Sequence, residues 1–249
     1  LLFDITAGQH ATSAGSSSLD LTWGKKKQNI YNQFAQVLVG FDATGSVQKF
    51  DQDGDISSTS STDKFLNAYF LTFSRLLVKD EIKKGSFSMV VGVNSASAGP
   101  AAAIAAFNTT MTISDASGST NYFVNSPVGE YGILYSEIPT SGSLATAANH
   151  KVGLIYYQAG VVVLSPGIFA VSGTQIPSFS LSQSVQGQLS NTLGPVAMRG
   201  TGSSYANVSA LFGSGTIDDA CASLRNRIQT LSFNNTTELN STIHFCRIN

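Results

Sequence analysis

The chain has 249 residues, of which 42% are hydrophobic and only 12% are charged, and its formal net charge is -1 at pH 7. The hydrophobic share is sufficient for a core, whereas the charged share is about half of that in an ordinary soluble domain. The near-neutral balance excludes a strongly basic nucleic-acid-binding surface, and no apolar stretch approaches the ~18 residues that a membrane-spanning helix needs.

The first predicted elements are a strand over residues 1–7, a Ser/Gly-rich loop over 8–18 and a helix over about 26–40. Apolar residues recur there at helical spacing, and Gly40 is a typical residue to follow a helix C-terminus. The residues on this face are Ile30, Phe34, Val37, Leu38 and Phe41, and we expect the first four of them in the core. The short basic run Lys25, Lys26 and Lys27 is expected to be solvated surface.

Turn residues at 43–46 and 50–55 predict two tight reversals after the helix. Residues 65–78 are rich in Phe, Tyr and Leu and predict a strand, followed by a polar turn at 79–85. Phe87, Met89, Val91 and Val93 alternate, which predicts a strand with one buried face. A small-residue loop over 94–106 precedes further strands predicted at 107–113, 121–125 and 130–136.

The clearest hairpin signal lies at 152–164, where two apolar runs flank Gln158, Ala159 and Gly160. Residues 172–215 are rich in Ser, Gly and Gln and predict a long loop or an arm. A second helix is predicted over about 217–229, capped by Thr216, with acidic residues in its first turn. Its expected buried face is Ile217, Cys221, Leu224 and Ile228. Strands near 229–233 and 239–248 complete the chain.

These elements predict a β-dominated α+β fold, with many short antiparallel strands and two helices at about 26–40 and 217–229. We expect one β-rich structural domain over 1–249, with a loop or arm at 172–215. Both ends of the sequence lie within strand-like segments, so we expect the chain to be an internal part of a longer polypeptide.

Few residues suggest chemistry. His10, His150 and His244 are far apart and lack the spacing of a metal site. Asp51, Asp53 and Asp55 alternate, but Ile56 and Thr62 stand where a calcium loop needs Gly and Glu, so an acidic turn is favoured over a calcium site.

The Gly- and Ser-rich segments do not match catalytic motifs either. The segment 213–216 lacks the lysine of a phosphate-binding loop, and Ser203 lacks the context of a nucleophile elbow. We therefore expect no catalytic, cofactor-binding or metal-binding residues, and no enzyme. Cys221 and Cys246 do not make a disulfide framework, and we expect two unpaired thiols.

Several segments resemble virion structural proteins of T-even-like marine myoviruses, especially cyanophages. These segments follow one another in order over most of the chain, at 29–40, 45–54, 76–87, 124–135, 152–164 and 233–249. The proteins of this family carry no assigned activity. The loops at 94–120 and 172–215 match the family poorly.

The resemblance implies a structural subunit of a contractile-tailed bacteriophage virion, in the tail, baseplate or neck. The low charge is consistent with a surface covered by partners. The expected partners are other virion proteins and copies of the chain itself, without nucleic acid, membrane or cofactors, in particles assembled in the host cytoplasm. The 172–215 segment is expected to be ordered by such a neighbour.

Two alternative functions remain open. The chain is alternatively a capsid-surface or decoration protein, or a carbohydrate-binding module at the tail tip. For a carbohydrate-binding module, Tyr156 and Tyr157 are the candidate aromatic residues. At most one of them would lie on a binding face, because adjacent strand residues point to opposite faces.

Overall fold

The computed structural model describes residues 2–13, 21–54, 64–92, 110–138, 143–144, 151–169 and 208–237. The strands are β1 (Phe3–Gln9), β2 (Asn67–Phe73), β3 (Glu81–Ile82), β4 (Ser88–Gly92), β5 (Thr110–Ser114), β6 (Phe123–Ser126), β7 (Gly129–Ile138), β8 (Ser143–Leu144), β9 (Lys151–Tyr156), β10 (Val161–Leu164), β11 (Ile228–Ser232) and β12 (Asn235–Thr236). The helices are α1 (Leu21–Leu38), α2 (Arg75–Val78), the 3-10 helix η3 (Pro166–Phe169), α4 (Val208–Ser214) and α5 (Ile217–Arg225).

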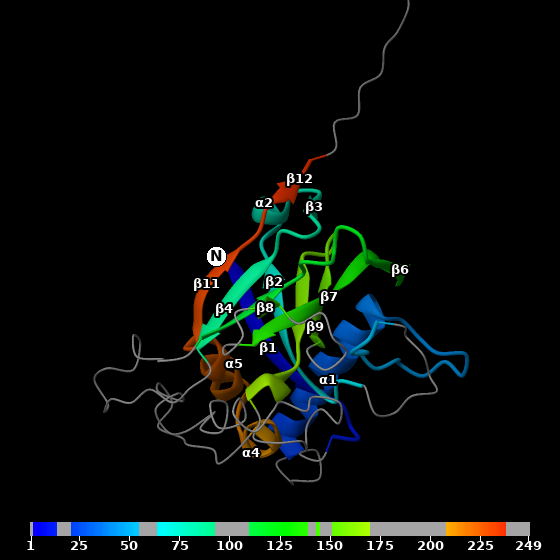
Figure 1. The fold of residues 1–249 in the computed structure, drawn as a ribbon. Coiled ribbons are helices and arrows are strands. Elements are labelled where there is room, and N and C mark those ends of the chain that lie inside the picture. Colours follow the sequence, from blue (N-terminus) through cyan, green and yellow to red (C-terminus); the bar gives the residue numbers. More distant parts are fainter. Residues whose placement is uncertain are drawn as a thin grey trace, which may run out of the picture.

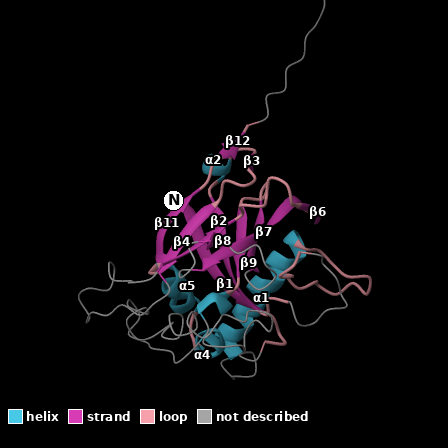
Figure 2. Ribbon diagram, in the orientation of Figure 1, coloured by secondary structure: helices cyan, strands magenta, loops and turns pink. Residues whose placement is uncertain are grey.

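A ten-stranded antiparallel sheet forms the body of the molecule (Figure 1). Its strand order is β1-β2-β10-β9-β7-β5-β4-β11, and β6 and β8 join it through β7. A separate two-stranded sheet pairs β12 with β3. The described part of the chain is therefore rich in antiparallel strands, with fewer helices (Figure 2), and the predicted β-dominated α+β class is confirmed.

The sheet buries apolar side chains on both faces. Along β2, Tyr69, Leu71 and Phe73 join a core cluster that also contains residues of α4 and α5. Ala68 and Phe70, which alternate with them, join a second cluster that contains residues of α1. Because neighbouring strand residues point to opposite faces, a sheet covered on both faces needs the continuous apolar runs seen in β2, β9 and β10.

Several predicted elements are confirmed. The hairpin at 152–164 forms from β9 and β10, and Gly160 has the positive φ of 65° that its turn requires. Phe87, Met89 and Val91 are buried at alternate positions around β4. Thr216 caps α5: its Oγ1 accepts from the Asp219 N–H at 3.0 Å, and the Asp219 carboxylate accepts from the Thr216 N–H at 3.2 Å.

The buried face of α1 differs from the prediction. The helix begins at Leu21, and it buries Tyr31, Ala35 and Leu38 against the sheet. Ile30 and Phe34 are only partly buried, whereas Val37 and Phe41 are 59% and 57% exposed. The apolar pattern predicts the wrong face because Tyr31 lies at the centre of the buried one. Its ring packs in the core while its hydroxyl forms hydrogen bonds.

Lys27 also contradicts its predicted place at the surface. It is fully buried, and its ammonium donates to the carbonyls of Phe212 and, at 2.8 Å, of Gly215. Carbonyls at a helix C-terminus lack partners within the helix and carry partial negative charge, so they suit a lysine. Lys27 thus ties α1 to the end of α4.

Helical turns replace two predicted segments. The predicted strand 65–78 ends at Phe73, and α2 follows it. The Phe73 N–H donates to the carbonyl of Gly160, which lies in the turn of the β9–β10 hairpin. Beyond Phe73 there is no ladder of β10 to continue pairing. The predicted loop 172–215 contains α4, whose Leu211 and Phe212 are fully buried, and the rest of that segment up to residue 207 lies outside the described residues.

The second predicted helix is shorter than expected. α5 ends at Arg225, because the chain turns into β11 at Ile228 and pairs with β4. Leu224 is buried as predicted, whereas Ile217, Cys221 and Ile228 are only partly buried. The loop predicted at 94–106 and the strand predicted at 239–248 both fall outside the described residues.

Candidate functional site

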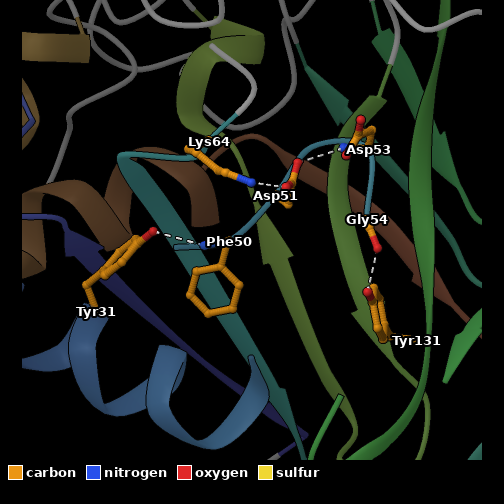
Figure 3. A network of polar contacts seen from close by, with 7 residues as sticks. All are labelled: Tyr31, Phe50, Asp51, Asp53, Gly54, Lys64 and Tyr131. Carbon is orange, nitrogen blue, oxygen red and sulfur yellow. Dashed lines mark hydrogen bonds and ion pairs between the residues drawn. The ribbon is translucent and has the colours of Figure 1, made fainter. Parts of the chain in front are cut away.

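The most distinctive polar cluster lies where two short segments, 50–54 and 64–66, run antiparallel on the α1 side of the sheet (Figure 3). An isolated β-bridge pairs Asp51 with Lys64. Beside it, the Phe65 N–H donates to the Phe50 carbonyl at 2.9 Å. Phe50 and Phe65 are both buried, so the bridge sets charged side chains opposite each other within an apolar environment.

Asp51 and Lys64 form a shielded ion pair. The Lys64 ammonium donates to Asp51 Oδ2, and the two side chains are only 9% (Lys64) and 1% (Asp51) exposed. The backbone N–H of Asp53 donates to the other carboxylate oxygen, Asp51 Oδ1, at 3.3 Å. The side chains of Lys64, Asp51 and Asp53 therefore form one group, which we call the Asp51–Lys64 cluster.

Burial raises the pKa of Asp51 to about 7. The hydrogen bond from Lys64 opposes this shift, and a side-chain hydrogen bond with Asp53 adds to it. Near neutral pH the Asp51 carboxyl is thus divided between its charged and neutral forms. The cluster can exchange protons among its three side chains without changing its total charge.

Two tyrosine hydroxyls hold the segments in place. Tyr31 of α1 donates to the Phe65 carbonyl at 2.6 Å and accepts from the Phe50 N–H at 3.2 Å. Tyr131 of β7 donates to the Gly54 carbonyl at 2.6 Å. Both rings are buried, so each hydroxyl fixes backbone on one side of the Asp51–Lys64 pair.

Gln52 adds a third anchor from between the two carboxyl groups. Its side chain is buried and donates to the carbonyl of Lys151 in β9 at 2.7 Å. Hydrogen bonds to α1, β7 and β9 thus fix the segment that carries both carboxyl groups. Such support restricts the motion of the side chains that react or bind.

A second cluster surrounds Lys84. Its ammonium pairs with Glu130 and, at 3.8 Å, with Glu81, and it lies over the ring of Tyr122 at 4.9 Å. Partial burial lowers the pKa of Lys84, but the hydrogen bond to Glu130 and the charge of Glu81 raise it on balance. The side chains of Lys84, Glu81 and Glu130 are 20%, 23% and 28% exposed, so this cluster is open to water where the Asp51–Lys64 cluster is not.

Asp115 has a structural role beside that cluster. Its carboxylate accepts from the backbone N–H groups of Gly85 and Phe87, each at 2.8 Å. Burial raises its pKa, and the two backbone hydrogen bonds partly offset that effect. The arrangement closes the turn between β3 and β4.

Of the candidate residues predicted from the sequence, the structure describes His10, Asp51, Asp53 and Cys221, and among these a hydrogen bond joins Asp51 and Asp53. His10 packs edge-on against Tyr31 with ring centroids 5.5 Å apart, and its Nδ1 accepts from the Thr12 N–H. Burial, with the charge of Lys49, lowers its pKa. His150, His244, Ser203, Asp55 and Cys246 fall outside the described residues, whereas Cys221 is a free cysteine.

In the described ranges no group of three His, Cys, Asp or Glu side chains could hold a metal ion. Within the same ranges, none of the helices is both long and apolar enough to cross a membrane. The segment 213–216 forms the end of α4 and the cap of α5, and the Lys27 ammonium donates to the Gly215 carbonyl, where an anion site would need hydrogen-bond donors.

Sequence patterns did not identify the Asp51–Lys64 cluster. The alternation of Asp51 and Asp53 predicts an acidic turn rather than a calcium site, and Lys64 belongs to no sequence motif. The pairing depends on a return of the chain between residues 54 and 64, which leaves no periodic signal. Comparison with protein-family profiles, with curated proteins and with solved structures gives no significant match.

Proposed function

We propose that the chain is a structural subunit of a contractile-tailed bacteriophage virion, located in the tail, baseplate or neck. The six segments that resemble virion proteins of T-even-like myoviruses support this proposal. Five of them contain described helices or strands: the second half of α1, α2 with β3, the β6–β7 hairpin, the β9–β10 hairpin and β12.

The observation that carries the proposal is the exposure of large apolar side chains on a chain with few charges. Val37 and Phe41, at the end of α1, are 59% and 57% exposed. The β6–β7 hairpin lies next to them, since Ser126 donates to the Leu38 carbonyl at 2.6 Å, and this hairpin carries Val124, which is 69% exposed. Apolar side chains that gather at a surface are typical of protein–protein contacts.

A second pair of exposed apolar side chains lies where the N-terminal residues meet the start of α2. Leu2 and Leu76 are 66% and 88% exposed, and the Ser74 N–H donates to the Leu2 carbonyl, which places the two leucines near each other. Two separate apolar areas suit a subunit that contacts more than one neighbour in an assembly.

The edge strand β11 supports the same function. In the described part of the chain β11 pairs only with β4, and its five residues (Ile-Gln-Thr-Leu-Ser) carry no charge and no proline. Monomeric proteins commonly protect an edge strand with charge or proline, because unpaired N–H and C=O groups recruit other strands. An uncharged edge can instead accept a strand from a neighbouring subunit.

The alternative of a carbohydrate-binding module loses its candidate residues. Tyr156 and Tyr157 are 1% and 0% exposed, so neither can present a ring to a sugar. Tyr156 stacks on Tyr131 with centroids 5.2 Å apart, within the core. The tyrosine pair was therefore a wrong choice for a binding platform.

The proposal is tested on purified particles of the phage that encodes the chain. Quantitative mass spectrometry should find its peptides in a fixed ratio to other tail proteins after density-gradient purification. Antibody–gold labelling should mark the tail, baseplate or neck, whereas labelling of the head would favour a capsid-surface protein. Absence of the chain from purified particles would refute a virion role.

Surface variants make the test specific. Val37→Ser combined with Phe41→Ser should reduce incorporation into particles at least several-fold, since it removes apolar contact area without touching the core. The matched control is Gln33→Ser, an exposed position of the same helix, which should incorporate normally. Equal incorporation of both variants would show that this surface makes no contact in the particle.

A further inference from the structure

We propose that the folded chain joins Lys64 to Asp51 through an intramolecular isopeptide bond, with Asp53 as the carboxyl that transfers protons. The reaction condenses the Lys64 side-chain amine with the Asp51 side-chain carboxyl to give an amide and one water. It requires an amine and a carboxyl held in contact, an adjacent acid–base group, and little competing water.

The backbone holds the two reacting groups in contact. The β-bridge between Asp51 and Lys64 sets their side chains opposite each other, and the Lys64 Nζ already contacts an Asp51 oxygen (Figure 3). The hydroxyls of Tyr31 and Tyr131 and the amide of Gln52 fix the surrounding backbone. Because folding has already oriented the two groups, their reaction avoids the entropy cost of a bimolecular encounter. The effective concentration of such oriented groups reaches about 10⁵ M or more.

Burial favours the product over the ion pair. A buried ammonium and a buried carboxylate each pay a desolvation cost, whereas an amide is neutral. Asp51 is 1% exposed and Lys64 9%, and Phe50 and Tyr31 beside them are fully buried. Burial also raises the pKa of Asp51, so that its neutral, electrophilic form is present near neutral pH.

The protons and bonds balance without any further reactant. A proton first passes from the Lys64 ammonium to the Asp51 carboxylate, which gives a neutral amine and a neutral acid. The amine then attacks Asp51 Cγ and forms the C–N bond. Asp53, whose carboxyl hydrogen-bonds to that of Asp51, accepts a proton from the nitrogen and delivers it to the Asp51 hydroxyl. The C–O bond breaks, water leaves, and one hydrogen remains on the amide nitrogen.

The Lys84–Glu130 pair provides a comparison within the same chain. It has the same two functional groups in contact and a second carboxyl, Glu81, at 3.8 Å. Its side chains are exposed to water, and no β-bridge sets them opposite each other. Water stabilises the charged forms there, so this pair should remain an ion pair.

The test is the mass of the purified, folded wild-type chain, measured after denaturation. We expect it to be lighter than its sequence by one water, and tryptic digestion should give a branched peptide that joins Asp51 to an uncleaved Lys64. Lys84 should be cleaved normally. A full-mass chain with cleavage at Lys64, or a water loss that maps elsewhere, overturns the proposal.

Variants assign the roles of the side chains. Lys64→Arg keeps the positive charge but not the nucleophile and should have its full mass. Asp51→Asn should still form the bond but release ammonia instead of water. Asp53→Asn should slow formation of the bond at least tenfold, measured by refolding chains that were recovered unfolded before the bond could form. A wild-type rate in the Asp53→Asn variant would remove Asp53 from the reaction.

Discussion

Adjacent residues of α1 distinguish the observed helix face from the one that the apolar pattern predicts. Leu38 is 1% exposed and packs in the cluster beneath α1, whereas Val37 is 59% exposed. Replacing a buried leucine by alanine removes its transfer free energy and leaves a cavity, which together cost about 2–5 kcal/mol. Leu38 lies at the helix end, where neighbours can partly close the cavity, so we expect about 3 kcal/mol for Leu38→Ala.

Val37→Ala is the matched control, and its cost should stay within about 0.5 kcal/mol, as for most surface positions. The assay is equilibrium unfolding in urea with circular dichroism and intrinsic fluorescence as two probes. With a slope of about 2–3 kcal/mol/M, Leu38→Ala should lower the midpoint by about 1 M. If Val37→Ala destabilises the chain as much as Leu38→Ala does, α1 packs with the other face and our account of the core is wrong.

Three further predictions use the same unfolding assay. A Cβ on Gly132 would lie 2.2 Å from the Tyr157 hydroxyl, so Gly132→Ala should lower the free energy of unfolding by about 1–3 kcal/mol. Addition of Tyr157→Phe should recover part of this loss, whereas additive losses from the two substitutions would refute the clash. Thr216→Ala removes the cap of α5 and should cost about 1 kcal/mol, whereas Thr216→Asn should cost less; equal losses would argue against capping. The pKa of His10 is lowered in the folded chain, so as the pH drops through the ordinary value of 6.5 the unfolded chain binds a proton at His10 first and the free energy of unfolding should fall. His10→Asn should make this fall smaller. A pH profile of stability that the substitution leaves unchanged would contradict the prediction.

The sequence correctly predicted the elements whose structure is determined by residues close together in the chain. The β9–β10 hairpin follows from two apolar runs around a glycine turn, and the α5 cap follows from Thr216 and Asp219. The alternation of Phe87, Met89 and Val91 likewise gave the inward face of β4. In each case the residues that decide the structure lie within a few positions of one another.

Features that depend on distant contacts could not be predicted in this way. Lys27 is buried because carbonyls more than 180 residues along the chain receive its ammonium. The predicted strand 65–78 stops at Phe73 because the neighbouring strand β10 begins at Val161, opposite Thr72, and offers no partner beyond it, which the composition of 65–78 does not indicate. The Asp51–Lys64 cluster combines both difficulties, since a polar pair and its apolar surroundings come from α1, β7, β9 and two loop segments.

The central claim is that the exposed apolar side chains of this chain are covered in a phage particle. A high-resolution density map of the whole virion tests it most directly. The account predicts the fold in the tail, baseplate or neck, with Val37 and Phe41 buried against a neighbouring chain and an interface of more than about 1,000 Å² in total. A particle map that accounts for its tail proteins without this fold, or that shows both side chains facing solvent, would contradict it.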